Sequence, residues 1–433
     1  MKKKSVNRSA FFNLRALLGL VLCLAGVALA FFAFSKALAQ QGSRGSASGK
    51  EPSSRVAQYR GVAPVVRFDV SPPLRNIKPI PPGPGQLREN EDRDIVPRRK
   101  GVVKPDPVVQ STIGREPAIP GPVVSFDGQP NSSGVAPPDP NGAVGPNHVV
   151  AMANLSFQIF NKSGTSLFGP AANNTLWTGF GGPCQTENAG DPVVLYDQLA
   201  DRWLLSQFTA AGPTFFNCIA VSTTPDPTGP YFRYAVSTGG NFPDYPKYGV
   251  WPDAYYISTR EFLGAAGAFQ GVGAYAINRA QVLAGNPSPQ IISFLAPPTG
   301  AGANVGDGLL PTNLDGMTLP PAGSPNYYLG TMDDNGPYGA ALDALTLWKF
   351  HVDFAVPGNS TFGMTDTLPT GHTYYWRVRA QDGANTGPGG TGQRVHISGF
   401  EVWNIGADGL IAESHGEFDE ADYQRQLKHG LET

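Results

Sequence analysis

The chain has 433 residues and a formal net charge of -2, which gives no support to nucleic acid or an anionic membrane surface as a partner. Glycine (53 residues) and proline (41 residues) are abundant, whereas charged residues make up only 15%. Many turns and few charges are typical of a secreted protein with short strands rather than of a helical enzyme. The composition therefore predicts an all-β fold.

The first 39 residues have the pattern of a signal peptide. Five lysines and arginines precede an uninterrupted apolar run over residues 16–34, and an Ala-x-Ala cleavage pattern ends at Ala39. Cleavage there predicts a secreted, periplasmic or cell-surface protein. The apolar run also approaches the ~20 residues that cross a bilayer, so an uncleaved transmembrane anchor is the alternative.

Two cysteines, Cys184 and Cys218, remain after residue 39. Because export leads to an oxidising compartment, the sequence predicts that they form one disulfide. Two buried free thiols are the alternative.

Residues 40–121 are rich in proline and predict a disordered spacer, because proline removes backbone donors and favours extended geometry. A short apolar piece at residues 65–68 is expected to attach this spacer to the domain that follows.

Residues 122–356 form a series of short apolar or alternating runs between turn signals, which is typical of strands. Similar units recur loosely along this region. Repeats of about 40 to 45 residues predict a β-propeller of about five blades. A large β-sandwich is the alternative architecture.

Two segments in this region, residues 136–148 and 244–253, resemble a family of secreted bacterial proteins of unassigned function, as does the spacer piece at 67–75. The resemblance implies an exported β-propeller-like domain. It supplies no catalytic residues.

The C-terminal part differs in character. Within a linker at residues 357–394, residues 373–380 resemble one strand of a fibronectin type III module. Residues 395–433, a predicted hairpin and short helix, resemble the end of SnoaL-like polyketide cyclase domains. That resemblance implies an acid/base role for Asp419, with His415 beside it in a pocket. The first strands and helices of that fold are absent, and the alternative is that the tail packs on the propeller.

A pair of carboxylates is the candidate for catalysis. Asp191 and Asp253 each precede a predicted strand, and equivalent positions of successive blades can converge near a propeller axis. Two such groups could hydrolyse a glycosidic bond, one as the acid and the other as base or nucleophile. The alternative is that both residues only cap the start of a strand.

Ligand-binding candidates lie nearby in the sequence. Arg202 and Arg260 could hold an acidic sugar through paired hydrogen bonds. Tyr248 and Trp251 could stack on sugar rings, although aromatic residues also fill the cores of blades.

A weak calcium site is the remaining candidate, and no other cofactor is predicted. Asp139 and Asn141 offer two close oxygens in one turn, and Ca²⁺ prefers oxygen ligands. Both residue types also favour turns because they bond their own backbone.

Three functional hypotheses follow. The first is a non-catalytic β-propeller-like binding or scaffold protein with a glycan or protein ligand. The second is an extracellular glycan hydrolase, and the third a cyclase-like or isomerase activity in the tail. Two carboxylates about 5 to 9.5 Å apart in an axial pocket would favour hydrolysis. Carboxylates bonded to nearby amides would favour binding.

Overall fold

The computed structural model describes residues 57–83, 123–264, 267–297, 308–314, 316, 319–332, 342 and 344–369, together with the backbone of residues 373–381, 396–405 and 411–418. The predicted signal segment, residues 1–39, lies outside them. Among the described residues, none of the helices has the length and apolar character needed to cross a membrane.

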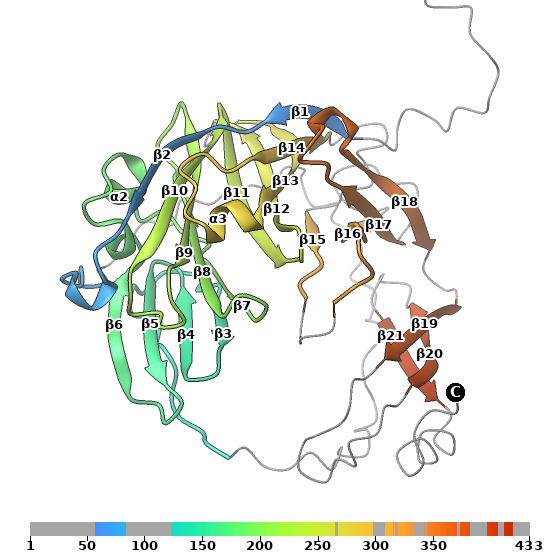
Figure 1. Cartoon of the computed structure of the whole chain (residues 1–433), viewed down its shortest axis with the longest axis horizontal. Coiled ribbons are helices and arrows are strands. Elements are labelled where there is room, and N and C mark those ends of the chain that lie inside the picture. Colours follow the sequence, from blue (N-terminus) through green and yellow to red (C-terminus); the bar gives the residue numbers. More distant parts are fainter. Residues whose placement is uncertain are drawn as a thin grey trace, which may run out of the picture. The chain divides into compact units, whose positions relative to one another are not determined.

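The fold is all-β, and the strands form antiparallel sheets that follow the chain order (Figure 1). Sheet I contains β3 (Asn141–Val144), β4 (His148–Ala153), β5 (Ser156–Asn161) and β6 (Ser166–Ala172). Sheet II contains β7 (Val193–Asp197), β8 (Arg202–Phe208), β9 (Phe215–Ser222) and β10 (Tyr231–Gly239). Each sheet is a meander in which consecutive strands pair.

Two more four-stranded meanders follow. Sheet III contains β11 (Asn241–Val250), β12 (Ala254–Leu263), β13 (Phe269–Asn278) and β14 (Ile291–Ala296). Sheet IV contains β15 (Leu309–Pro311), β16 (Asn326–Met332), β17 (Ala344–His351) and β18 (Thr361–Pro369). The predicted domain boundary at residue 356 is therefore too early, because β18 pairs along its whole length with β17.

Helices are short within the described residues. The α-helices are α2 (Pro183–Thr186) and α3 (Arg279–Leu283), and the 3-10 turns are η2 (Leu74–Asn76), η3 (Asn173–Trp177) and η5 (Pro357–Asn359). Asn278 caps α3 by accepting a hydrogen bond from the backbone amide of Gln281.

The first strands of the four sheets lie next to one another. β3 contacts β7, β7 contacts β11, and β11 contacts β15. Meanders that meet through their first strands have a propeller-like arrangement, as the sequence predicted. The predicted number of about five blades stays a prediction.

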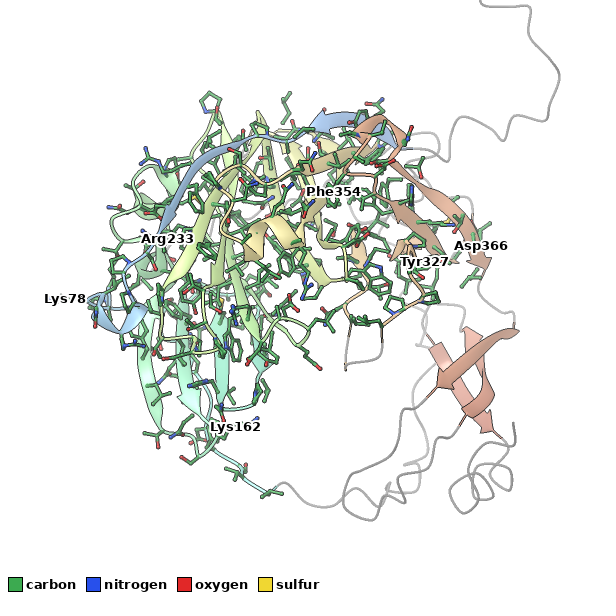
Figure 2. The ribbon with its side chains drawn as sticks, in the orientation of Figure 1. Lys78, Lys162, Arg233, Tyr327, Phe354 and Asp366 are labelled. Atoms are coloured by element: carbon green, nitrogen blue, oxygen red, sulfur yellow. A yellow bond between two sulfur atoms is a disulfide. The ribbon has the colours of Figure 1, made fainter. Side chains whose placement is uncertain are left out.

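The sheets pack face to face through apolar side chains that alternate along the strands. Figure 2 draws the side chains of the described residues on the ribbon. In β8, Leu205 joins the core between sheets I and II, whereas Leu204 joins the core between sheets II and III. In β12, Tyr255 faces sheet II and Tyr256 joins the core shared with sheet IV. Sheets II and III are thus buried on both faces.

Part of the predicted disordered spacer is ordered. β1 (Gln58–Val62) pairs with β14, and β2 (Val65–Val70) pairs with β10, so that they form the outermost strands of sheets III and II. We call residues 57–77 the N-terminal clasp. Its prolines lie between or after the strands, where their missing amide costs no ladder hydrogen bond.

Charged side chains fasten the clasp to both sheets. Arg233 of β10, which is only 1% exposed, donates two hydrogen bonds to the carboxylate of Asp69, at 2.8 and 2.6 Å. Arg60 forms an ion pair of 2.7 Å with the buried carboxylate of Glu261 on β12. The clasp therefore compensates charges that the sheets bury.

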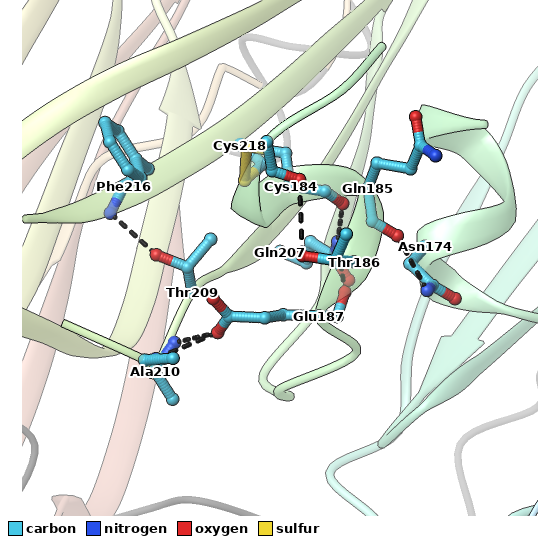
Figure 3. Close-up of a disulfide and its surroundings, with 12 residues drawn as sticks. Asn174, Cys184, Gln185, Thr186, Glu187, Gln207, Thr209, Ala210, Phe216 and Cys218 are labelled. Atoms are coloured by element: carbon cyan, nitrogen blue, oxygen red, sulfur yellow. Dashed lines mark hydrogen bonds between the residues drawn. A yellow bond between two sulfur atoms is a disulfide. The ribbon is translucent and has the colours of Figure 1, made fainter. Parts of the chain in front are cut away.

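The predicted disulfide is confirmed (Figure 3). It joins Cys184 of α2 to Cys218 of β9, whose Cα atoms are 5.8 Å apart. Gln207 donates to the carbonyl of Cys184, and Glu187 accepts from the backbone amide of Ala210. The connection before sheet II is thereby fixed to that sheet.

The C-terminal strands β19 (Thr373–Gln381), β20 (His396–Ile405) and β21 (Ile411–Phe418) form one three-stranded sheet, sheet V. The fibronectin-like strand and the predicted hairpin belong to this single sheet, instead of to a linker and a separate fragment. His415 lies in β21, opposite Val402. Asp419 lies outside the described residues, and the cyclase resemblance stays a prediction.

Candidate functional site

A pocket of about 330 Å³ opens where the first strands of the sheets come together. Its walls come from the turns that begin β3 and β7, from the middle of β11 and from β15. The lining residues are Asp139, Pro140, Asn141, Asp191, Pro192, Val193, Leu195, Tyr245, Pro246, Lys247, Tyr248, Leu310 and Pro311.

Three sheets present the same backbone conformation to this pocket. Asp139, Asp191 and Tyr245 have positive φ angles of 35°, 40° and 45°, and each is followed by a proline. Left-handed backbone is costly for residues other than glycine, and it often occurs at functional sites. The repeat explains why residues far apart in the sequence meet at one place.

Asn154 connects two of these turns. This buried residue, in the turn between β4 and β5, donates from Nδ2 to Asp139 Oδ2 at 2.9 Å and to Asp191 Oδ1 at 3.5 Å. Its Oδ1 accepts from the backbone amide of Asp191 at 2.8 Å. The two pocket carboxylates are therefore close neighbours that share one amide donor.

The wall formed by β11 combines an aromatic ring with a cation. The backbone amide of Tyr245 donates to Asp191 Oδ2 at 3.2 Å. The ammonium group of Lys247 lies 3.0 Å from the centroid of the Tyr245 ring. A cation over a ring is attracted by its negative face, which fixes both side chains.

Of Arg202, Arg260, Tyr248 and Trp251, only Tyr248 lines the pocket. The side chain is 6% exposed, and burial raises the pKa of its phenol, which lies next to Ser206. Tyr248 therefore stays neutral at physiological pH.

The structure does not bring Asp191 and Asp253 together. β11 runs from the pocket at Tyr245 to Val250, a span of about 16 Å at 3.3 Å per residue, and Asp253 lies beyond its far end. There the Tyr256 hydroxyl donates to Asp253 Oδ2 at 3.3 Å, and burial raises the pKa of the carboxyl. The separation far exceeds what a glycosidase pair needs.

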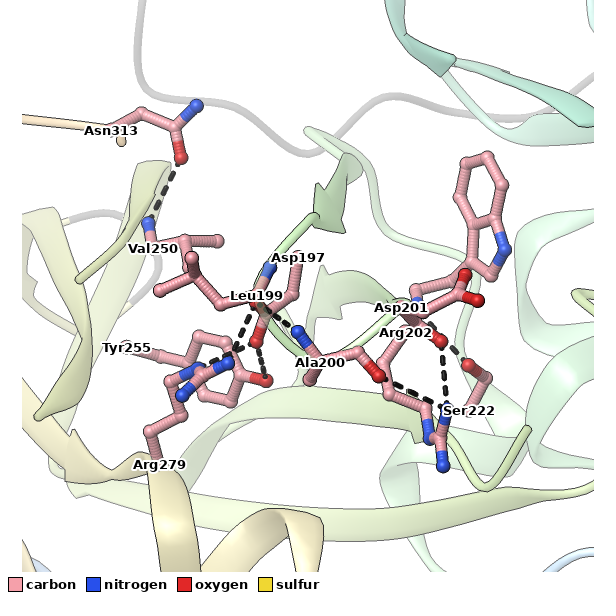
Figure 4. Close-up of polar contacts among 11 residues, drawn as sticks. Asp197, Leu199, Ala200, Asp201, Arg202, Ser222, Val250, Tyr255, Arg279 and Asn313 are labelled. Carbon is pink, nitrogen blue, oxygen red and sulfur yellow. Dashed lines mark hydrogen bonds and ion pairs between the residues drawn. The ribbon is translucent and has the colours of Figure 1, made fainter. Parts of the chain in front are cut away.

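The predicted arginines also lie away from the pocket lining. Arg202 donates to the backbone carbonyls of Ala200 and Asp201 and so closes the turn between β7 and β8 (Figure 4). Arg260 is buried in β12, with its guanidinium 5.4 Å from the centroid of the Phe262 ring. Both arginines act in local structure.

Trp251 belongs to the core between sheets III and IV, and its indole donates to the carbonyl of Ser324 at 3.0 Å. It is 7% exposed and is absent from the pocket lining, so it offers no face for a sugar ring there.

The oxygens of the predicted calcium site take part in hydrogen bonds within the protein. Asn141 Oδ1 accepts from the backbone amide of Val194 at 2.7 Å, and Asp139 Oδ2 accepts from Asn154. Among the described residues, no group of three or more histidine, cysteine, aspartate or glutamate side chains is arranged to hold a metal. Calcium binding stays a prediction.

A buried ion pair joins sheets II and III at the other end of β7 (Figure 4). Arg279 donates to both carboxylate oxygens of Asp197, at 2.6 and 2.9 Å, and the Tyr255 hydroxyl donates to the same carboxylate at 2.7 Å. This cluster fixes how the two sheets meet, and the sequence did not reveal it.

Sequence reasoning also missed Asn154 and Lys247. The signal that could have found Lys247 is the repeated residue-proline pair, since Tyr245-Pro246-Lys247 matches Asp139-Pro140-Asn141 and Asp191-Pro192-Val193. Asn154 carries no such signal, because its role depends on a contact between two turns.

Neither the known protein families nor the curated proteins contain a match to this sequence. Among solved structures, the chain resembles an endo-arabinase from Bacteroides thetaiotaomicron at 12% identity and a TM-score of 0.28, covering 65% of this chain and 92% of that one. A xylan beta-1,4-xylosidase from Bacillus halodurans matches at 10% identity and 0.28, covering 66% and 54%. A beta-fructofuranosidase from Bombyx mori matches at 10% identity and 0.29, covering 64% and 66%. These scores support no argument about activity.

Proposed function

We propose that this chain is an exported β-propeller-like protein that binds a neutral glycan in the pocket between β3, β7, β11 and β15. The proposal is based mainly on the hydrogen bonds that hold the carboxylate of Asp191 in the pocket. Its carboxylate accepts hydrogen bonds from the amides of Asn154 and Tyr245, which fixes it as an oriented acceptor. Fixed carboxylates beside aromatic rings are suited to the hydroxyl groups and the apolar faces of sugars.

Charge determines the class of glycan. The lining contains two carboxylates, Asp139 and Asp191, and one cation, Lys247, whose ammonium lies on the Tyr245 ring. The two arginines expected to hold an acidic sugar lie elsewhere. An acidic sugar would meet two negative groups, whereas a neutral one would donate its hydroxyls to them.

Export supports a glycan ligand outside the cytoplasm. It rests on the sequence pattern of residues 1–39 and on the disulfide between Cys184 and Cys218, since disulfides persist in oxidising compartments.

The test is a glycan array on the mature chain, followed by calorimetric titration of each neutral oligosaccharide that binds. We expect binding to neutral and not to uronic-acid glycans, and D191N should weaken it about tenfold or more through loss of a charged acceptor. R202A is the matched control, because Arg202 lies outside the pocket lining and should leave the affinity unchanged. Binding confined to acidic glycans, or unaffected by D191N, would contradict the proposal.

Hydrolysis of a bound glycan is the second candidate, and it is favoured by one observation. Asp139 and Asp191 approach the same Asn154 nitrogen, so the pocket holds two neighbouring carboxylates in place of the predicted pair. Product analysis of each bound oligosaccharide separates the two functions. If the chain is a hydrolase, D139N should abolish product formation and retain binding; if no ligand is cleaved, the pocket only binds.

A further inference from the structure

One face of sheet IV is only partly buried where β15, β16 and β17 lie side by side. Tyr328, Trp348 and Phe350 belong to its buried face, which packs on sheet III. The opposite face carries Leu310, Leu329 and Leu347, which are direct neighbours across β15, β16 and β17. We call these three residues the leucine row.

The leucine row is more exposed than most of the apolar side chains of the neighbouring sheets. Leu310 is 55% exposed, Leu329 and Leu347 are half-buried, and Tyr327 beside them is 37% exposed. In sheets II and III, by contrast, apolar side chains are buried on both faces. Contiguous exposed apolar side chains mark a surface that another element covers.

Sheet V lacks a layer to pack against among the described residues. A three-stranded sheet depends on packing one face against another layer, and the described residues give it no such layer. Its strands form the same kind of antiparallel meander as sheets I to IV, and β19 lies at its edge, as the first strand does in sheet I. Every second position of β19 (Tyr374, Trp376, Val378 and Ala380) is aromatic or apolar, whereas Arg377 and Arg379 lie between them in the sequence.

The connection between the two sheets is short. Only residues 370–372 separate β18 from β19, so their ends lie within about 14 Å of each other. Face-to-face sheets pack about 10 Å apart. A still shorter link, the single residue Gly240, joins β10 of sheet II to β11 of sheet III.

We propose that sheet V covers the leucine row and is the fifth blade of the propeller. β19 then lies beside β15 and borders the pocket, because Leu310 belongs both to the leucine row and to the pocket lining. The tail is thus part of the propeller, and a separate cyclase pocket is not needed to explain it.

Maleimide labelling of single-cysteine variants of the full mature chain tests this packing. L310C is compared with L263C, a control of similar exposure in the described residues (55% and 60%) at the end of β12. We expect L310C to react at least about tenfold more slowly, because sheet V shields it. Equal rates would overturn the proposal.

Two further measurements keep the result decisive. If the shielding of L310C weakens on dilution of the protein, a second copy of the chain covers the leucine row and the proposal is wrong. L329D should lower the Tm by about 5 °C or more if sheet V covers this side chain, since a buried carboxylate would then be unpaired. An unchanged Tm contradicts the packing.

Discussion

Asp253 shows how the local environment decides the role of a residue. It follows Trp251-Pro252 and was predicted to be half of a catalytic pair, but it closes the hairpin between β11 and β12. Its carboxyl accepts a hydrogen bond from the Tyr256 hydroxyl, and partial desolvation raises the pKa of that carboxyl. Asp191 has the same residue type before a strand, yet it lines the pocket.

Replacing Asp253 should change stability in a pH-dependent way. Burial raises the pKa of its carboxyl in the folded state, so the folded protein binds the proton more tightly than the unfolded chain does. Stability is therefore lost as the pH rises from about 4, the pKa in the unfolded chain, through the raised value. D253N should raise the Tm only slightly at pH 7, by less than about 1 °C, because Asp253 is an exposed residue and solvent screens its charge, with no gain below about pH 3.5. Thermal melts across this range check it.

Asp353 provides a control of opposite sign. Hydrogen bonds from the backbone amide of Val356 and from Asn359 lower the pKa of its exposed carboxyl. Its contribution is present above the ordinary carboxyl pKa and is lost as the pH falls through the lowered value. D353N should therefore lower the Tm at pH 7, and equal behaviour of the two variants would contradict this account.

At the scale of elements, strands with a local sequence pattern could be predicted, whereas strands that depend on distant partners could not. The sequence predicted strands from alternation and turn signals, which are local features of the chain. It could not show that residues 58–70 form strands, because their partners β10 and β14 lie more than 160 residues away. Proline content alone suggested disorder there.

The disulfide acts between elements, since it ties α2 to β9. Closing 34 residues of chain reduces the entropy of the unfolded state, by an amount worth about 4 kcal/mol. The C184S/C218S double variant should lose that much free energy of unfolding in urea. Wild-type protein with reductant should match it, and a loss below about 1 kcal/mol would mean that Gln207 and Glu187 alone fix this segment.

At the scale of the whole molecule, the N-terminal clasp holds sheets II and III together from outside. D69A should cost about 3 kcal/mol of unfolding free energy, because it leaves the buried guanidinium of Arg233 without its carboxylate. Denaturant unfolding measures this loss, and hydrogen exchange should rise in β2 and β10.

The exposed pair between Arg75 and Asp226 is the matched control for the clasp. Its side chains are 53% and 43% exposed, so R75A should cost no more than about 1 kcal/mol. If both substitutions cost the same, burial of Arg233 is not what gives the clasp its stabilising effect.

The sequence by itself determined the all-β character, the positions of most strands in residues 148–257, and the cysteine pair. These features depend on short-range alternation and turn chemistry, or on a count of two cysteines. Only the tertiary structure decided which polar residues share a pocket. Asp191 meets Asn154 and Tyr245 because three sheets bring their turns together, whereas Asp253 is carried to the far end of β11. The physical reason is that strand length and sheet stacking set these distances, and neither can be obtained from residue types.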